Sequence, residues 1–296
     1  MIAGGLRQQR FPAGLALLIA VAAVSWAAIL VRLCDAPSLG IAFYRMLFAT
    51  LAIAPWGLRS TGPVSVRTYG LAVTAGVLLG LHFATWISSL AFTTVASSVV
   101  LVSAQPVFTA ILGPLLLRES PGGRGWAAVT LALAGTVVLA GGDWRGDPRA
   151  LLGDALALAG ALTASLYLMI GRRVRERIGF TRYLTVIYGS AAASLLVMAL
   201  VGGVSLRGYP ALTWLWLILL AAGPNLLGHS LLNWSVRRLR ALTVNLAILG
   251  EPLLATLYAA LLLAEVPTPS FYAGAALIVG GVALAVWDES GRSRPI

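Results

Sequence analysis

Long apolar runs recur along almost the whole chain, from Phe11 to Trp287, and only short polar segments separate them. A transmembrane helix needs about 20 consecutive, mostly apolar residues, because it rises about 1.5 Å per residue across roughly 30 Å of hydrocarbon. The runs have that length and leave no room for a separate soluble domain. Composition agrees, since 59% of the 296 residues are hydrophobic and only 10% are charged, against about 25% charged residues in soluble domains. The chain is therefore predicted to be an all-α integral membrane protein.

The apolar runs predict ten transmembrane helices. We place them at residues 12–31, 38–56, 69–90, 95–117, 125–141, 150–170, 181–201, 211–236, 241–263 and 270–287. The first run follows Arg7 and Arg10, as a signal peptide would, but it is long enough to span and no convincing cleavage site follows it. We expect it to be retained as the first helix.

The placement of arginine predicts an orientation. All 21 basic residues are Arg. If the N-terminus is cytoplasmic, 16 of them fall in segments on the inside, four fall outside, and Arg45 lies within the second helix. This is the asymmetry of the positive-inside rule. We therefore expect a multi-pass protein of a bacterial inner membrane with both termini cytoplasmic. Topology then explains the net charge of +11 better than nucleic-acid binding does.

The chain repeats itself at a fixed offset of 146 residues. The stretch from Gln105-Pro106 to Glu119-Ser120-Pro121 matches the stretch from Glu251-Pro252 to Glu265-Val266-Pro267. Each half would then hold five helices, residues 1–142 and 143–296, and an odd number makes the halves enter the membrane from opposite sides. Inverted repeats are typical of secondary transporters, whose substrate site lies near the midplane between the repeats.

With ten helices, two five-helix halves and the repeated Pro-to-Glu spacing, the sequence resembles the drug/metabolite transporter superfamily, specifically its EamA-like exporters. The resemblance covers essentially the whole chain, and Arg45 and Glu251-Pro252 also fit positions familiar in that family. It implies two inverted five-helix repeats around a central cavity and export of amino acids or other small metabolites. The nearest likeness is to aromatic-amino-acid exporters of bacterial inner membranes.

Ionisable side chains at membrane depth are costly, so each one is a candidate functional residue. Arg45 and Glu251 fall near the middle of their predicted helices. Arg45 could bind a substrate carboxylate and Glu251 could exchange protons. The alternative, which we favour, is that both are structural charges.

Two histidines and several amides form a second group of candidates. His82 and Trp86 lie four residues apart on one helix face, and Asn225, His229 and Asn233 form a similar stripe on the eighth helix. The offset between the histidines is 147, close to that of the repeat. We expect one histidine toward each side of a central cavity, where it either titrates or bonds a backbone carbonyl.

Aromatic side chains inside helices form a third group, because they could wall an apolar cavity with polar edges. The candidate substrate-binding residues are Trp26, Tyr44, His82, Trp86, Tyr167, Tyr188, Asn225, His229 and Asn245. Simple packing is the commoner role for an internal aromatic residue. Trp and Tyr residues near helix ends are instead typical of interfacial anchors.

These features favour a secondary transporter that exports small amphipathic metabolites, most of all amino acids, by alternating access. No nucleotide-binding loop of the GxxxxGK[ST] type occurs, so ATP is not expected to drive it, and we expect no cofactor and no metal. Its partners would be the lipid bilayer and a small-molecule substrate. An intramembrane enzyme is the less favoured alternative, because the chain has no HExxH motif. A passive channel is a further alternative.

Overall fold

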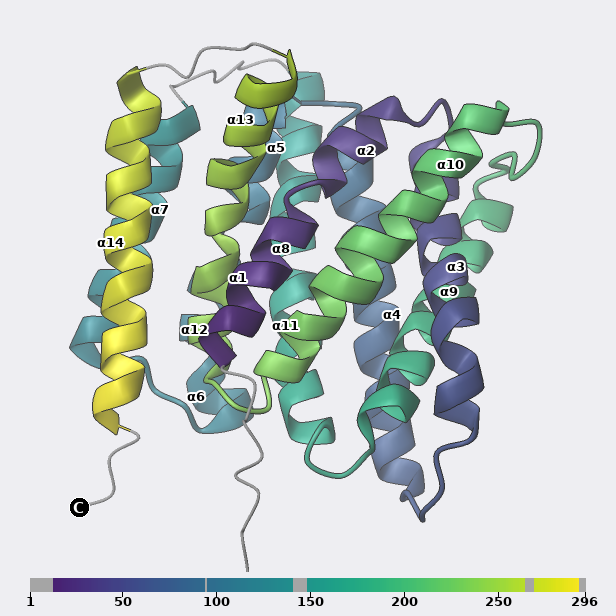
Figure 1. Ribbon diagram of the computed structural model, residues 1–296, viewed down its shortest axis with the longest axis horizontal. Coiled ribbons are helices and arrows are strands. Elements are labelled where there is room, and N and C mark those ends of the chain that lie inside the picture. The colour runs from purple at the N-terminus through teal and green to yellow at the C-terminus, as the bar shows by residue number, and fades with distance from the viewer. Residues whose placement is uncertain (1–12, 94, 141–147, 264–268, 293–296) are drawn as a thin grey trace, which may run out of the picture.

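The computed structural model describes residues 13–93, 95–140, 148–263 and 269–292, and within these ranges it contains helices and no strands. The helices stand side by side in one bundle (Figure 1). The prediction of an all-α protein is confirmed, and a helix occupies each of the ten predicted ranges. Glu265, Val266 and Pro267 of the repeat motif, and the terminal residues Arg7, Arg10 and Arg294, lie outside the described residues.

The helices of the first half are α1 (Ala13–Val24), α2 (Ala27–Leu33), α3 (Ser38–Leu58), α4 (Val66–Ser89), α5 (Val95–Val102), α6 (Gln105–Leu117) and α7 (Gly122–Ala140). Those of the second half are α8 (Pro148–Val174), α9 (Phe180–Val201), α10 (Ala211–Leu220), the π-helix η1 (Ala221–His229), α11 (Ser230–Ser235), α12 (Ala241–Ile248), α13 (Gly250–Leu263) and α14 (Pro269–Arg292).

Local chemistry explains where some of these helices begin and end. Helix α4 starts three residues before the predicted 69, because the Ser65 hydroxyl accepts a hydrogen bond from the backbone N–H of Thr68 at 3.2 Å. Such a cap satisfies one of the free donors of the first turn. Helix α8 extends past the predicted 170 to include Arg172 and Arg173, and basic side chains are favourable in the last turn of a helix.

Eight helical segments in the described ranges are long and apolar enough to cross a membrane. They include α1 with α2, α5 with α6, and the continuous run from α10 through η1 to α11, each counted as one span. Helix α7 and the pair α12–α13 do not meet that measure by themselves, although Ala241–Ala255 is a shorter apolar helix. The membrane character is thus established, and the count of ten crossings stays a prediction.

Two spans are broken at positions that the repeat relates. Helix α5 ends at Val102 and α6 begins at Gln105, while α12 ends at Ile248 and α13 begins at Gly250. The two last residues differ by 146, the offset of the sequence repeat. The cause is local: each break lies just before a proline (Pro106 or Pro252), which lacks a backbone N–H and clashes with the preceding turn.

The run from α10 to α11 contains a break of another kind, the π-helix η1. Pro224 lies within it and has no N–H to donate, and the N–H of Ser230 reaches back five residues to the carbonyl of Asn225. Wider turns of this kind are often found at functional sites. Here η1 carries both Asn225 and His229.

Helix packing is consistent with two halves related by a pseudo-twofold axis. Helix α4 packs against α8, and its counterpart, the run from α10 to α11, packs against α1 and α2. Three pairs of equivalent spans contact each other directly: α3 with α9, α5–α6 with α12–α13 (through α6 and α12), and α7 with α14. The last pair stands at one side of the bundle in Figure 1. The largest contacts between helices therefore recur when the halves are exchanged.

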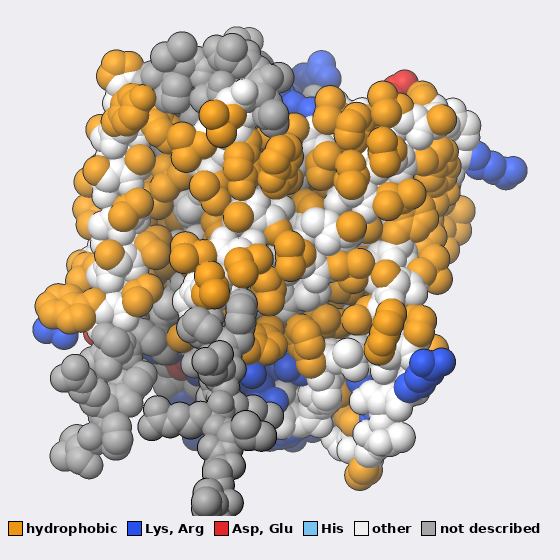
Figure 2. Space-filling model, viewed as in Figure 1, with side chains coloured by type: hydrophobic (Ala, Val, Ile, Leu, Met, Phe, Trp, Pro, Cys, Tyr) orange, Lys and Arg blue, Asp and Glu red, His pale blue; other side chains and the backbone are white. Residues whose placement is uncertain are grey.

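The two ends of the bundle are polar and the belt between them is apolar. Figure 2 shows hydrophobic side chains over the middle of the face it presents, with the visible Arg side chains toward the ends. The side chains of Trp56, Trp126 and Trp287 are 61%, 43% and 62% exposed, as expected of anchors at a membrane interface. Helix α1 begins and α14 ends at the same end of the bundle (Figure 1). That end is the predicted cytoplasmic one, and its assignment to the cytoplasm stays a prediction.

Candidate functional site

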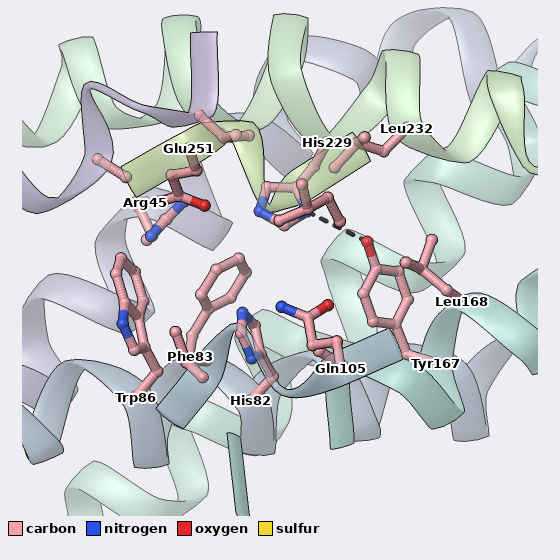
Figure 3. Close-up of a pocket in the computed structure, with 15 residues that line it drawn as sticks. Arg45, His82, Phe83, Trp86, Gln105, Tyr167, Leu168, His229, Leu232 and Glu251 are labelled. Carbon is pink, nitrogen blue, oxygen red and sulfur yellow. Dashed lines mark hydrogen bonds between the residues drawn. The ribbon is translucent and has the colours of Figure 1, made fainter. Parts of the chain in front are cut away.

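A cavity lies at the centre of the bundle, where the breaks in the spans meet α3, α4, α8 and η1 (Figure 3). Its volume is about 40 Å³, which is room for a few water molecules and far less than the roughly 300–1,000 Å³ of a small-molecule pocket. It is lined by Val24, Ala27, Arg45, His82, Phe83, Trp86, Val102, Gln105, Ala164, Tyr167, Leu168, His229, Leu232, Ile248 and Glu251. Both halves of the chain contribute to this wall.

Arg45 on α3 is the most buried charge in the wall, with no exposed surface. Its Nε and Nη2 atoms both donate to Oδ1 of Asn225, the first at 3.0 Å. The guanidinium lies 4.0 Å from the centroid of the Phe83 ring, an attractive cation–π arrangement. Asn225 is held in turn, since its Nδ2 donates to the carbonyl of Arg45 at 3.3 Å. The remaining nitrogen, Nη1, has no hydrogen-bond partner.

Glu251 and Gln105 enter the wall from the two proline-linked breaks. Gln105 is the first residue of α6, and Glu251 is the second residue of α13. They occupy equivalent positions of the repeat, yet one is an amide and the other a carboxylate. No ion pair or direct hydrogen bond joins Glu251 to Arg45 among the described residues. The two charges therefore stand in one wall without neutralising each other by contact.

The two histidines lie on facing sides of the cavity. Their ring centroids are 6.5 Å apart. Nδ1 of His82 lies 3.0 Å from the carbonyl of Gly160, so this nitrogen carries the proton. Nδ1 of His229 lies 3.1 Å from the hydroxyl of Tyr167. Each histidine is thus oriented by a bond to α8, but only His82 has the predicted bond to a backbone carbonyl.

The cavity is polarised along its length. Figure 3 shows Arg45, Trp86 and Glu251 at one end and Tyr167, Leu168 and Leu232 at the other. The ring of Trp86 is parallel to that of His82, with centroids 6.1 Å apart and 2° between the planes. Its indole Nε1 is buried and has no partner. A ligand with a charged head and an apolar tail matches this division.

Six of the eleven candidate residues from the sequence line the cavity: Arg45, His82, Trp86, Tyr167, His229 and Glu251. Tyr188 and Asn225 lie directly behind the wall, because the Tyr188 hydroxyl donates to the Asn225 carbonyl at 3.1 Å and Asn225 holds Arg45.

The other three candidates lie elsewhere. Trp26 stacks on Tyr258 with centroids 4.7 Å apart. Tyr44 donates its hydroxyl to the carbonyl of Leu206 at 2.6 Å. Asn245 donates to Thr109 at 2.6 Å. The structure does not bring these three to the cavity.

Sequence reasoning missed several lining residues. Phe83, Leu168 and Leu232 are ordinary apolar residues within apolar helices, so no pattern distinguishes them from packing residues. Gln105 carried a signal: the repeat aligns it with Glu251, and an intramembrane amide at that position marks it as a partner in the same site.

Polar bonds between the halves close the predicted cytoplasmic end of the bundle. Nε of Arg172, at the end of α8, pairs with Oε1 of Glu119 after α6 at 2.5 Å. Within the second half, Arg172 also donates to the carbonyls of Val236, at 2.7 Å, and Leu239, which hold it in place. Nη2 of Arg240 donates to the carbonyl of Ser120 at 2.6 Å. We call the two contacts that cross between the halves, Arg172–Glu119 and Arg240–Ser120, the inner latch.

The opposite end is also bonded across the halves. Oδ1 of Asp154 on α8 accepts from the hydroxyls of Thr93 and Ser97, each at 2.8 Å. The hydroxyl of Tyr44 and the carbonyl of Leu206 add a further link. Side-chain bonds therefore join the two halves at both ends of the bundle. In the described part of the chain no group of three or more His, Cys, Asp or Glu residues lies close enough to hold a metal ion.

The fold and the cavity define a class, that of a multi-pass membrane protein with a small polar site between two packed halves. Comparison with known proteins identifies the family. The model of the EamA-like transporter family matches residues 12–141 and again residues 151–287. The chain belongs to the EamA-like transporter family, which is built from two repeats. It is a membrane transporter and not an enzyme.

Individual relatives are also named as transporters. The chain is 25% identical over 276 residues to an uncharacterized transporter of Archaeoglobus fulgidus, covering 93% of this chain and 96% of that one. It is 24% identical over 246 residues to the uncharacterized transporter YdfC of Bacillus subtilis, covering 82% and 79%. A solved crystal structure with 21% identity superposes with a TM-score of 0.76 over 95% of this chain and 99% of that one, which supports the fold alone.

Proposed function

We propose that the protein exports small amphipathic metabolites, most of all amino acids, from the cytoplasm through the central cavity by alternating access. The observation that carries the proposal is the make-up of the wall: one Arg and one Glu at one end, and aromatic and aliphatic side chains at the other. A zwitterionic head with an apolar side chain complements both parts. A multivalent anion would meet only one cation there.

Alternating access is supported by the arrangement of the halves. The cavity lies where the two repeats meet, and exchange of the halves preserves the largest helix contacts. Two packings related in this way differ little in energy, so the protein can open to either side in turn. Cross-half bonds at both ends favour such a carrier over an open channel. A cavity of about 40 Å³ must widen to admit an amino acid.

The proposal includes the finer assignments made from the sequence. The repeats would divide near residues 142 and 143, and the protein would lie in the bacterial inner membrane with both termini cytoplasmic. The excess of Arg in the segments of that side supports the orientation. Aromatic substrates are favoured by Phe83, Trp86 and Tyr167 in the wall.

The test is efflux from proteoliposomes loaded with a panel of radiolabelled amino acids, with and without a pH gradient. We expect saturable efflux and counterflow of amino acids with large apolar side chains. Efflux that follows the pH gradient would show proton coupling, and efflux indifferent to it would show facilitated exchange. The amino-acid assignment fails if no member of the panel is transported by protein that elutes as a single folded species.

A pair of variants on one helix ties transport to the cavity. Leu168→Trp adds bulk to the cavity wall, whereas Leu151→Trp adds the same bulk to a side chain of α8 that is 59% exposed. We expect Leu168→Trp to lower the efflux rate at least tenfold and Leu151→Trp to leave it unchanged. Equal effects of the two variants would place the pathway elsewhere.

A further inference from the structure

Two nitrogen donors in the cavity wall are buried without an acceptor. They are Nη1 of Arg45 and Nε1 of Trp86. The side chains that carry them are 0% and 4% exposed, on α3 and α4. A buried donor without a partner destabilises the fold, so most buried donors are satisfied. Because both side chains line one cavity, whatever enters the cavity can provide the acceptor.

The two donors lie at the same end of the cavity. Figure 3 shows the Arg45 and Trp86 side chains together on one side, with Glu251 next to Arg45. The other two guanidinium nitrogens are taken by Asn225, which fixes the plane of the group. A carboxylate has two acceptor oxygens, so it can accept from a guanidinium nitrogen and an indole nitrogen at once. A charge-assisted pair of this kind is stronger than two neutral hydrogen bonds.

The repeat supplies an asymmetry that completes the site. At equivalent positions the first half provides the amide of Gln105 and the second half the carboxylate of Glu251. The cavity thus holds one cation and one anion that do not pair directly. Glu251 is available for a positive group of the ligand, while Gln105 adds hydrogen bonding without charge.

From this geometry we propose that Arg45 Nη1 and Trp86 Nε1 together bind the carboxylate of the substrate, and that Glu251 binds its ammonium group. The site then selects zwitterions over simple acids and simple amines. The side chain of the substrate extends toward Tyr167, Leu168 and Leu232. This inference rests on the proposed function, because it assigns the orientation in which an amino acid occupies that same cavity.

Three probes that share one aromatic ring test the assignment by binding to the full-length, detergent-solubilised protein: L-phenylalanine, 3-phenylpropionate and 2-phenylethylamine. Dissociation constants come from titration calorimetry. We expect the wild type to bind L-phenylalanine at least tenfold more tightly than either of the others. Equal affinity for 2-phenylethylamine, or no binding of any probe, would overturn the proposal.

Trp86→Phe removes the indole donor and keeps an aromatic ring. A hydrogen bond to a charged group is worth about 1.5–3 kcal/mol, so we expect roughly tenfold or more loss of affinity for L-phenylalanine and 3-phenylpropionate. Affinity for 2-phenylethylamine stays within about twofold. Trp126→Phe on α7, 43% exposed at the outside of the bundle, is the matched control and changes nothing. Equal losses for all three probes, or no loss for any, would show that Trp86 does not bind the carboxylate.

Glu251→Gln recreates at the second break the residue that Gln105 provides at the first. We expect the preference for L-phenylalanine over 3-phenylpropionate to fall at least tenfold, because the ammonium loses its anionic partner. The exposed Glu176→Gln after α8 is the control. An unchanged preference would overturn the role of Glu251.

Efflux measured in parallel separates the two proposals. Binding in the predicted pattern without efflux would retain the binding mode and refute transport of amino acids. If L-phenylalanine is exported but neither variant changes the binding preference among the three probes, transport of amino acids is retained and the binding mode is refuted.

Discussion

The cost of burying Arg45 is met mainly by one side chain. Asn225 accepts from two guanidinium nitrogens, and the ring of Phe83 covers the face of the group. Asn225 is positioned by the π-helix η1 and by the hydroxyl of Tyr188, which donates to its carbonyl. The widened turn therefore holds the charge through Asn225, which explains why Asn225 belongs to the site without lining the cavity.

Replacing Asn225 by Leu should destabilise the protein by about 2 kcal/mol, because a buried charge loses its acceptor. The double variant Arg45→Met with Asn225→Leu should be destabilised less than the single variant, since no unpaired charge remains. Thermal unfolding in detergent measures both. If the effects of the two substitutions simply add, Asn225 is not the partner that keeps Arg45 buried.

At the scale of helices, α4 and α9 pack with their backbones in close contact. A methyl group added at Gly76 would lie 2.5 Å from the carbonyl oxygen and 2.9 Å from Cα of Ile187. One added at Gly80 would lie 3.1 Å from the carbonyl oxygen of Ala191. Both neighbours are backbone and cannot rotate away. The GxxxG pattern of this span thus allows two backbones from opposite halves to touch.

We expect Gly76→Ala to destabilise the protein by roughly 1–3 kcal/mol, because the added methyl forces α4 and α9 apart. Gly70→Ala on the same helix is the matched control. No atom lies within 4 Å of the methyl added there, and the change should be neutral or stabilising by about 0.5–1 kcal/mol. The measurement is thermal unfolding of both variants in the same detergent. Equal unfolding midpoints would show that close contact at Gly76 does not stabilise the packing of α4 on α9.

The sequence was sufficient for the helices and for the charged part of the site. An apolar run of membrane length is stable in the bilayer as a helix, so the predicted ranges agree with the structure to within a few residues. Arg45 and Glu251 stand out because ionisable residues are rare at that depth. The π-helix was not foreseen, because Pro224 in a helix predicts a kink and not the kind of turn that forms.

Aromatic residues were the weaker part of the prediction. Trp86 and Tyr44 look alike in sequence, since each lies inside an apolar helix. In the structure Trp86 lines the cavity, while Tyr44 packs edge-on against Trp214 with centroids 4.8 Å apart. Only the rotation of each helix separates the two roles, and that rotation is set by packing between distant segments.

At the scale of the whole molecule, the inner latch ties the halves together at one end. The side chains of Arg172 and Glu119 are 24% and 18% exposed, so their pair is partly screened and worth about 1 kcal/mol. A latch of that strength can bias an equilibrium between states without preventing their exchange.

Glu119→Gln should shift the population about fivefold toward the state open at this end. The reporter is Ala164→Cys in the cavity wall, in a Cys34→Ser background, labelled by a membrane-impermeant thiol reagent in inverted vesicles. Glu176→Gln is the control. Slower or unchanged labelling of the Glu119 variant would show that the latch does not hold the closed state.

Cys34, the single cysteine, tests the orientation. It follows α2 at the end of the bundle opposite the latch and is partly buried. Burial raises the pKa of its thiol to about 11, while the charge of Arg45 opposes the rise. Since the thiolate is the reactive form, labelling should be slow at pH 7 and about tenfold faster for each pH unit up to 9. It should occur from the outside of spheroplasts and vanish in Cys34→Ser. Labelling only in inverted vesicles would reverse the predicted orientation.

The unequal charges of the two halves bear on how such a chain could arise. Helix α9, the counterpart of α3, carries its one Arg in its first turn and none deeper. A dimer of two first halves would therefore place two guanidinium groups in the cavity without a carboxylate, and a dimer of two second halves would place two carboxylates without a guanidinium. Neither could offer one charge of each sign. A single chain that joins two unlike halves can place one charge of each sign in the same cavity, as the proposed binding of a zwitterion requires.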